Sequence, residues 1–175
     1  WGEGNSPDFP WLEMPRPDAW DAAVSLLENL GAISDHRITD LGQRMVQLPI
    51  HPRLARMVLE AGRRGCLSRT ALLAAMLAER DPFLRNTQGA GRSNAGIHTK
   101  SLPKWDSDCF ERLVAIENFL QRNPARSPFG DLHIGGVRSI VASAEQIIAQ
   151  ARNMFSANHD ELDCADGDSD EILQC

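Results

Sequence analysis

The chain has 175 residues, of which 42% are hydrophobic and 24% are charged, and its formal net charge is −6. This composition is typical of globular chains with one or two small domains. No apolar run approaches the roughly 18 residues of a membrane span, so the sequence excludes a transmembrane helix and predicts no membrane partner.

The four cysteines, Cys66, Cys109, Cys164 and Cys175, are widely spaced and form no CxxC pair. This spacing argues against a zinc site, and no metal site is predicted. No secretory signal pattern is present, so reduced thiols and a cytoplasmic location are expected. Because the chain starts at Trp1 and not at Met, we expect it to be part of a longer protein.

The charge is distributed unevenly along the chain. Residues 1–50 contain 3 basic and 8 acidic residues, residues 51–105 contain 10 and 3, residues 106–159 contain 5 and 6, and residues 160–175 contain 0 and 7. The net charges of the four segments are therefore −5, +7, −1 and −7. A locally positive surface can bind polyanions by releasing their counterions, even when the whole chain is acidic.

A linker and a helix are predicted at the start of the chain. Residues 1–17 contain four prolines and are typical of an extended linker. Asp18 is predicted to cap a helix that runs to about Leu30, and Gly31 to end it. The predicted buried face of this helix holds Trp20, Val24 and Leu27.

A winged-helix outline is predicted over residues 18–50. The first helix is followed by a short hairpin at 32–38, and Thr39 can cap the next helix because its hydroxyl can accept from a free backbone N–H. That helix must stop before Pro49, because a residue that precedes proline avoids the α region. Its only obvious base-reading side chains, Gln43 and Arg44, are few for sequence-specific DNA binding.

A two-faced helix is predicted after this break, with Pro52 in its first turn. One face is apolar and carries Leu54, Met57, Val58 and Ala61. The other face carries Arg53, Arg56, Glu60, Arg63 and Arg64. This charged face is either the solvated side of a core helix or a stripe that faces phosphates, and amphipathicity alone does not choose between them.

A family resemblance is carried by three runs: Leu41-Gly42-Gln43-Arg44-Met45, Leu48-Pro49 and His51-Pro52-Arg53-Leu54-Ala55. Together they resemble the helicase-associated region of DEAH-box RNA helicases, most closely the bacterial HrpB kind, over residues 1 to about 85. The resemblance implies a linker from an absent motor domain at 1–17, a winged-helix subdomain at 18–50 and a ratchet-like helical bundle at 51–155. Residues 156–175 are predicted to be an acidic disordered tail.

The bundle is predicted to contain three further helices. Ser68 is expected to cap a helix that is apolar almost all round and therefore central. At its end, Arg80 either contacts nucleic acid or, as we favour, pairs with Glu79 or Asp81. A helix is expected from about 106 to 122, followed by an irregular loop at 123–136. The last helix shows apolar residues at helical spacing over five turns, from Val137 to Phe155.

The longest irregular segment, 84–105, carries only positive charges and several glycines. It is not a phosphate-binding P-loop, because Lys100-Ser101 is preceded by Thr99 where that motif requires glycine. No Walker motif, Asp-Glu-Ala-His motif or catalytic triad occurs elsewhere, so the chain is predicted to have no catalytic residues. The resemblance places ATP and Mg²⁺ in absent motor domains.

The predicted fold is therefore mostly α, a winged-helix subdomain followed by a helical bundle. The resemblance to the helicase-associated region implies the function of an accessory region which braces RecA-like motor domains and lines the channel for single-stranded RNA. Two alternatives remain: a winged-helix regulator that binds duplex DNA, and a protein-interaction module whose basic stripe docks an acidic partner. The predicted RNA contacts, chosen by charge, are Arg53, Arg56, Arg63, Arg64, Arg85, Lys100 and Lys104.

Overall fold

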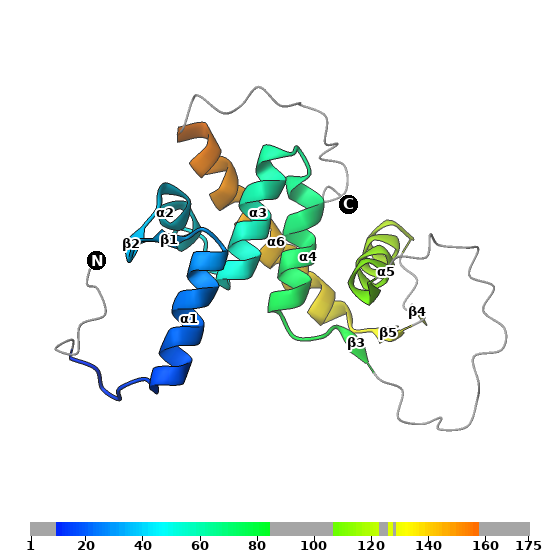
Figure 1. Cartoon of the computed structure of the whole chain (residues 1–175). Coiled ribbons are helices and arrows are strands. Elements are labelled where there is room, and N and C mark those ends of the chain that lie inside the picture. Colours follow the sequence, from blue (N-terminus) through cyan, green and yellow to red (C-terminus); the bar gives the residue numbers. More distant parts are fainter. Residues whose placement is uncertain (1–9, 85–106, 123–125, 128, 158–175) are drawn as a thin grey trace.

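The computed structural model describes residues 10–84, 107–122, 126–127 and 129–157 (Figure 1). Helices dominate this part of the chain, which confirms the predicted mostly α fold, and none of its helices is long and apolar enough to cross a membrane. In chain order the elements are α1 (Pro17–Asn29), β1 (Ile33–Ser34), β2 (Arg37–Ile38), α2 (Asp40–Val46), α3 (Pro52–Arg63), α4 (Leu67–Ala78), β3 (Phe83–Leu84), α5 (Asp108–Arg122), β4 (Arg126–Ser127), β5 (Gly130–Leu132) and α6 (Ile134–Ala157).

Helix α1 begins two residues earlier than predicted, with Pro17 in the first turn. The prediction that Asp18 caps it is wrong, because Asp18 lies inside the helix and its carboxylate accepts a 3.0 Å hydrogen bond from Arg16. Gly31 has φ +71° just after the helix, as a terminating glycine requires. The predicted buried face is only half-buried, and Trp20 packs edge-to-face on Trp11 with 5.9 Å between ring centroids.

The predicted hairpin forms from β1 and β2, which pair antiparallel with Ile33 opposite Ile38. Its turn places Asp35 and His36 at positive φ, as tight hairpin turns require. Thr39 caps α2 as predicted, and its hydroxyl accepts a 3.0 Å hydrogen bond from the Gly42 N–H. The same hydroxyl lies 2.6 Å from the carbonyl oxygen of Gly31, to which it can donate, so one side chain ties α2 to the end of α1.

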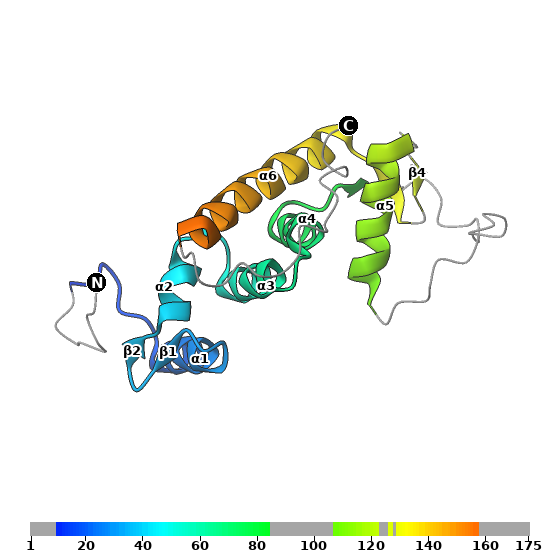
Figure 2. The ribbon, with the colours of Figure 1, turned by 90° about the horizontal axis from the view of Figure 1, so that it is seen from above.

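The core lies where α3 and α4 pack against each other and against α6, which crosses behind both in Figure 1 and runs along one side of them in Figure 2. Helix α4 is central, as predicted, since all of its residues from Ala71 to Met76 are buried, although Leu77 is 48% exposed. The predicted cap at Ser68 is wrong: Cys66 occupies the N-cap position without a side-chain hydrogen bond, and Ser68 lies in the first turn.

The long helix α6 confirms the predicted apolar periodicity, and Val137, Ile140 and Ala144 are almost fully buried. It begins at Ile134, three residues before the predicted start. His133 precedes it, and its Nδ1 accepts a 3.0 Å hydrogen bond from the Gly136 N–H, which satisfies one of the free donors of the first turn.

The predicted irregular loop at 123–136 is wrong in part, because β4, β5 and the start of α6 occupy much of it. The strands form a three-stranded sheet in the order β3-β5-β4, with Phe83 opposite Leu132. Helix α5 begins at Asp108, close to the prediction. Its buried face holds Leu113, Ile116 and Phe119, whereas Phe110 is 39% exposed.

Arg112 connects α5 to the segment that follows α4. Its guanidinium lies 5.2 Å from the ring centroid of Phe83 and 5.6 Å from that of Phe129, and Nη1 lies 3.0 Å from the Asp81 carboxylate. Glu79 instead accepts a 2.6 Å hydrogen bond from the Ser143 hydroxyl of α6. Arg80 forms no ion pair with any described residue, so its predicted pairing with Glu79 or Asp81 is wrong.

Candidate nucleic-acid interface

Helix α3 is positioned by the proline break that precedes it. Pro52 occupies the first turn, and the Nδ1 atom of His51 accepts a 3.2 Å hydrogen bond from the Arg53 N–H. The apolar face is anchored in the core as predicted at Val58 and Ala61. The buried set also includes two residues that were not predicted, Ala55 and Leu59.

The opposite face of α3 carries the charged set that the sequence predicted. We call Arg53, Arg56, Glu60, Arg63 and Arg64 the α3 stripe. Glu60 lies at its centre, with its carboxylate 2.8 Å from Nε of Arg64 and 3.3 Å from Nη1 of Arg56. The hydrogen bonds from Arg64 and then from Arg56 hold the pKa of the Glu60 carboxyl below its ordinary value. Glu60 is therefore ionised at neutral pH.

The arginines of the α3 stripe fall into two kinds. Arg56 and Arg64 share the Glu60 carboxylate, whereas Arg53 and Arg63 are exposed and have no ion pair with any residue that the structure describes. Four arginines and one glutamate leave the stripe with a charge of +3. Glu60 is 33% exposed, and ion pairs that solvent reaches contribute little, so a phosphate can replace Glu60 as the partner of either arginine.

The geometry of the α3 stripe suits a phosphate backbone. From Arg53 to Arg64 the helix rises by about 16 Å, which is long enough for more than one phosphate to bind. Each guanidinium presents a planar set of donors that matches two phosphate oxygens at once. Regularly spaced arginines on a helix contact a backbone without reading bases, so the arrangement predicts binding without sequence specificity.

The other predicted contacts, Arg85, Lys100 and Lys104, lie outside the described residues and stay predictions. Two exposed cations elsewhere, Arg80 and Arg138, were not among the predicted contacts. Charge alone could have included them, but no helical stripe marks them in the sequence. Within the described residues, no three His, Cys, Asp or Glu side chains gather in a way that could hold a metal ion.

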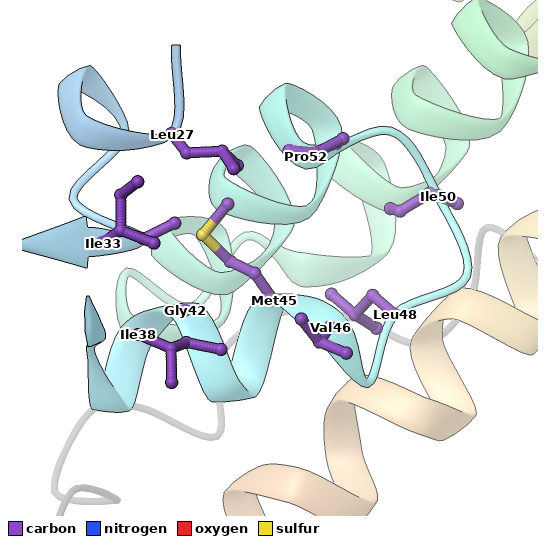
Figure 3. Close-up of a pocket in the computed structure, with 10 residues that line it drawn as sticks. Leu27, Ile33, Ile38, Gly42, Met45, Val46, Leu48, Ile50 and Pro52 are labelled. Carbon is purple, nitrogen blue, oxygen red and sulfur yellow. The ribbon is translucent and has the colours of Figure 1, made fainter. Parts of the chain in front are cut away.

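A second feature lies in the winged-helix part: an open pocket of about 270 Å³ between α1, the hairpin and α2 (Figure 3). Its wall includes Ile38 and Val46, which are 48% and 76% exposed. The sequence analysis did not predict this pocket. The apolar residues Ile38 and Val46, next to a short hairpin and a short helix, were the only signal for it in the sequence. The pocket suits an apolar side chain, because its lining is apolar throughout: Leu27, Ala32, Ile33, Ile38, Gly42, Met45, Val46, Leu48, Ile50 and Pro52.

Comparison with known families agrees with both parts of this architecture. The family described as helicase associated domain (HA2), ratchet-like, matches residues 51–170, and the one described as helicase associated domain (HA2), winged-helix, matches residues 23–50. The chain belongs to the HA2 helicase-associated family. Its homologues are DEAH-box and DExH-box ATP-dependent RNA helicases, as the resemblance implied.

Among these relatives, the ATP-dependent RNA helicase HrpA of Escherichia coli K12 is 41% identical over 128 residues, which are 68% of this chain and 9% of HrpA. The helicase DHX33 of Drosophila melanogaster is 33% identical over 171 residues, 96% of this chain and 24% of DHX33. The HA2 chain thus spans less than a quarter of the length of either relative. The closer likeness to the HrpB kind stays a prediction.

Proposed function

We propose that this HA2 chain is the accessory region of an ATP-dependent RNA helicase, and that its α3 stripe lines the channel through which single-stranded RNA passes. In this proposal the winged-helix part braces RecA-like motor domains outside this chain, and those domains bind ATP and Mg²⁺ in the cytoplasm. The relatives named above are RNA helicases, which supports the proposal at the level of the whole protein.

The observation that carries the RNA contact is that Arg53 and Arg63 have no acidic partner among the described residues. Both are exposed on one helix face, and neither is neutralised by an acid in the described part of the chain. The other two arginines of the stripe are held only by the half-buried Glu60 carboxylate, which an RNA phosphate can replace. The stripe therefore binds a polyanion at little cost in broken interactions.

The apolar pocket supports the bracing role. None of the residues of α1 is buried, and the pocket beside it exposes Ile38 and Val46. An apolar side chain from a motor domain would bury this surface, and its docking would be stabilised by about 25 cal/mol for each Å² of apolar surface removed from water. The duplex-DNA alternative is less well supported, because α2 has only 7 residues and Arg44 is half-buried and engaged in other interactions.

The test is a binding titration of the whole chain with fluorescent single-stranded RNA and with duplex DNA of the same sequence, over a series of salt concentrations. The variant is Arg53→Gln with Arg63→Gln. The matched control is Arg37→Gln with Arg138→Gln, which removes the same charge from exposed positions outside the stripe.

We expect the stripe variant to bind single-stranded RNA about tenfold more weakly at low salt. The slope of log K against log salt should fall by about 1.4, the value for two lost phosphate contacts on a single strand. The control should change the affinity much less. Equal losses in both variants would contradict the RNA contact, and a preference for duplex DNA would favour the regulator.

A further inference from the structure

The C-terminal end of α6 lies against the C-terminal end of α3. A Cβ atom added at Gly62 would overlap the ring of Phe155, so the ring packs directly on this glycine. Figure 1 shows this end of α6, in orange, beside α3. Arg63 and Arg64, the last arginines of the α3 stripe, follow Gly62 immediately.

An acidic segment follows α6 in the sequence. Residues 160–171 contain seven Asp or Glu, and residues 158–175 contain no Lys or Arg. Helix α6 ends at Ala157, and the three residue steps from there to Asp160 span at most about 11 Å. A helix with its side chains has a radius of about 5–6 Å, so this length suffices to pass from the Phe155 side of α3 to Arg63.

We propose that the acidic segment 160–171 docks on the α3 stripe and competes there with RNA phosphates, an inference that rests on RNA binding by the same stripe. Arg53 and Arg63 have no acidic partner in the described part of the chain, and the segment carries the charges that complement them. Because the segment is tethered beside the stripe, its effective concentration there is on the order of millimolar.

The competition follows from the shared chemistry of the two occupants. A carboxylate and a phosphate use the same donors of a guanidinium, so one arginine cannot bind both in the bidentate geometry. The apparent association constant for RNA therefore equals the constant of a free stripe multiplied by the fraction of molecules whose stripe is not occupied by the segment. Salt weakens the docking because the Debye length falls to about 10 Å at 0.1 M.

The docking itself is measured without RNA, by paramagnetic broadening of amide NMR signals in the whole chain. A nitroxide is attached to Cys164 after the changes Cys66→Ser, Cys109→Ala and Cys175→Ser. The informative signals come from residues 52–56, because they lie at the end of α3 far from Phe155. We expect broadening there that is lost in the Arg53→Gln, Arg63→Gln variant and kept in the Arg37→Gln, Arg138→Gln control. Broadening that both variants keep would overturn the docking.

The competition is measured by RNA titration of two further variants of the whole chain. One changes Asp160, Glu161, Asp163 and Asp166 to their amides. The control does the same to Asp21, Glu28, Asp35 and Asp40, so both raise the net charge by four. We expect the first to bind RNA about fivefold more tightly, which corresponds to a stripe that is about four-fifths occupied, and the control to change little. Equal tightening would overturn the competition.

The two measurements separate this inference from the proposed function. Broadening that depends on Arg53 and Arg63, in a chain that binds no RNA, would support the docking and overturn the RNA contact. RNA binding that depends on these arginines, without such broadening, would support the RNA contact and overturn the docking.

Discussion

The winged-helix part and the ratchet-like part of this chain bury very different amounts of apolar surface. In the winged-helix part, from α1 to residue 50, the buried hydrophobic residues are Ala32, Met45 and Leu48. In the ratchet-like part, α4 and α6 each contribute at least six. We infer from this difference that the ratchet-like part supplies most of the free energy of folding. The winged-helix part keeps apolar surface exposed, which is expected of a part that docks on another domain.

The largest expected effect is the loss of a core side chain in the ratchet-like part. Ile140→Ala removes a side chain that is fully buried in α6, and we expect it to lower the free energy of unfolding by about 2–5 kcal/mol. The matched change Leu27→Ala in α1 affects a half-buried side chain and should cost clearly less. Urea denaturation followed by circular dichroism measures both, and equal losses would contradict the comparison.

Gly42→Ala tests whether the winged-helix part can unfold while the ratchet-like part stays folded. A Cβ here would overlap the backbone carbonyl of Ala32 and lie 2.8 Å from Ile38 Cγ1, so we expect a loss of about 1–3 kcal/mol. Hydrogen exchange should accelerate in α1 and α2 and stay unchanged in α4 and α6. Gln43→Ala, at the exposed neighbouring position, is the control. Equal acceleration across all helices would show that the two parts unfold together.

A smaller effect is expected at the cap of α2. Thr39→Val keeps the shape of the side chain but loses its hydrogen bond with the Gly42 N–H, which should cost about 1 kcal/mol. Thr39→Ser keeps the hydroxyl and should stay within a few tenths of a kcal/mol of the parent. Thermal unfolding distinguishes the two, and equal melting temperatures would argue against the cap.

The smallest effect concerns the pH dependence of the α3 stripe. Because the pKa of Glu60 is lowered in the folded state, its ion pairs contribute stability above the unfolded glutamate pKa of about 4.3. That contribution is lost as the pH falls through the lower folded pKa. The stability difference between the parent and Glu60→Gln should therefore shrink on acidification. A difference that grows at low pH would contradict the assignment.

The parts of the fold that the sequence predicted are those governed by local periodicity. The apolar spacing from Val137 to Phe155 predicted α6, and the threonine and glycine at the helix boundaries predicted the cap of α2 and the end of α1. Asp18 was misplaced as a cap because Pro17 takes the first helical position, and both residues favour the same end of a helix.

The parts that the sequence missed depend on contacts between distant residues. The strands β3, β4 and β5 have two or three residues each, too few to show an alternating pattern, and β3 pairs with a strand more than 40 residues away. The partner of Asp81 is Arg112, not Arg80, because packing against Phe83 and Phe129 brings Arg112 into reach. Helical spacing identified the residues of the α3 stripe. Only the structure shows that Arg56 and Arg64 share the Glu60 carboxylate, because spacing alone does not determine which side chains pair.

The most direct test of the α3 stripe as the RNA-contact face is photo-crosslinking of the whole chain to single-stranded RNA that contains 4-thiouridine, with the sites mapped by mass spectrometry. We predict crosslinks on α3, between residues 52 and 64, that decline when Arg53 and Arg63 become Gln. Crosslinks concentrated on α2, around Gln43 and Arg44, and unaffected by those substitutions would contradict this assignment.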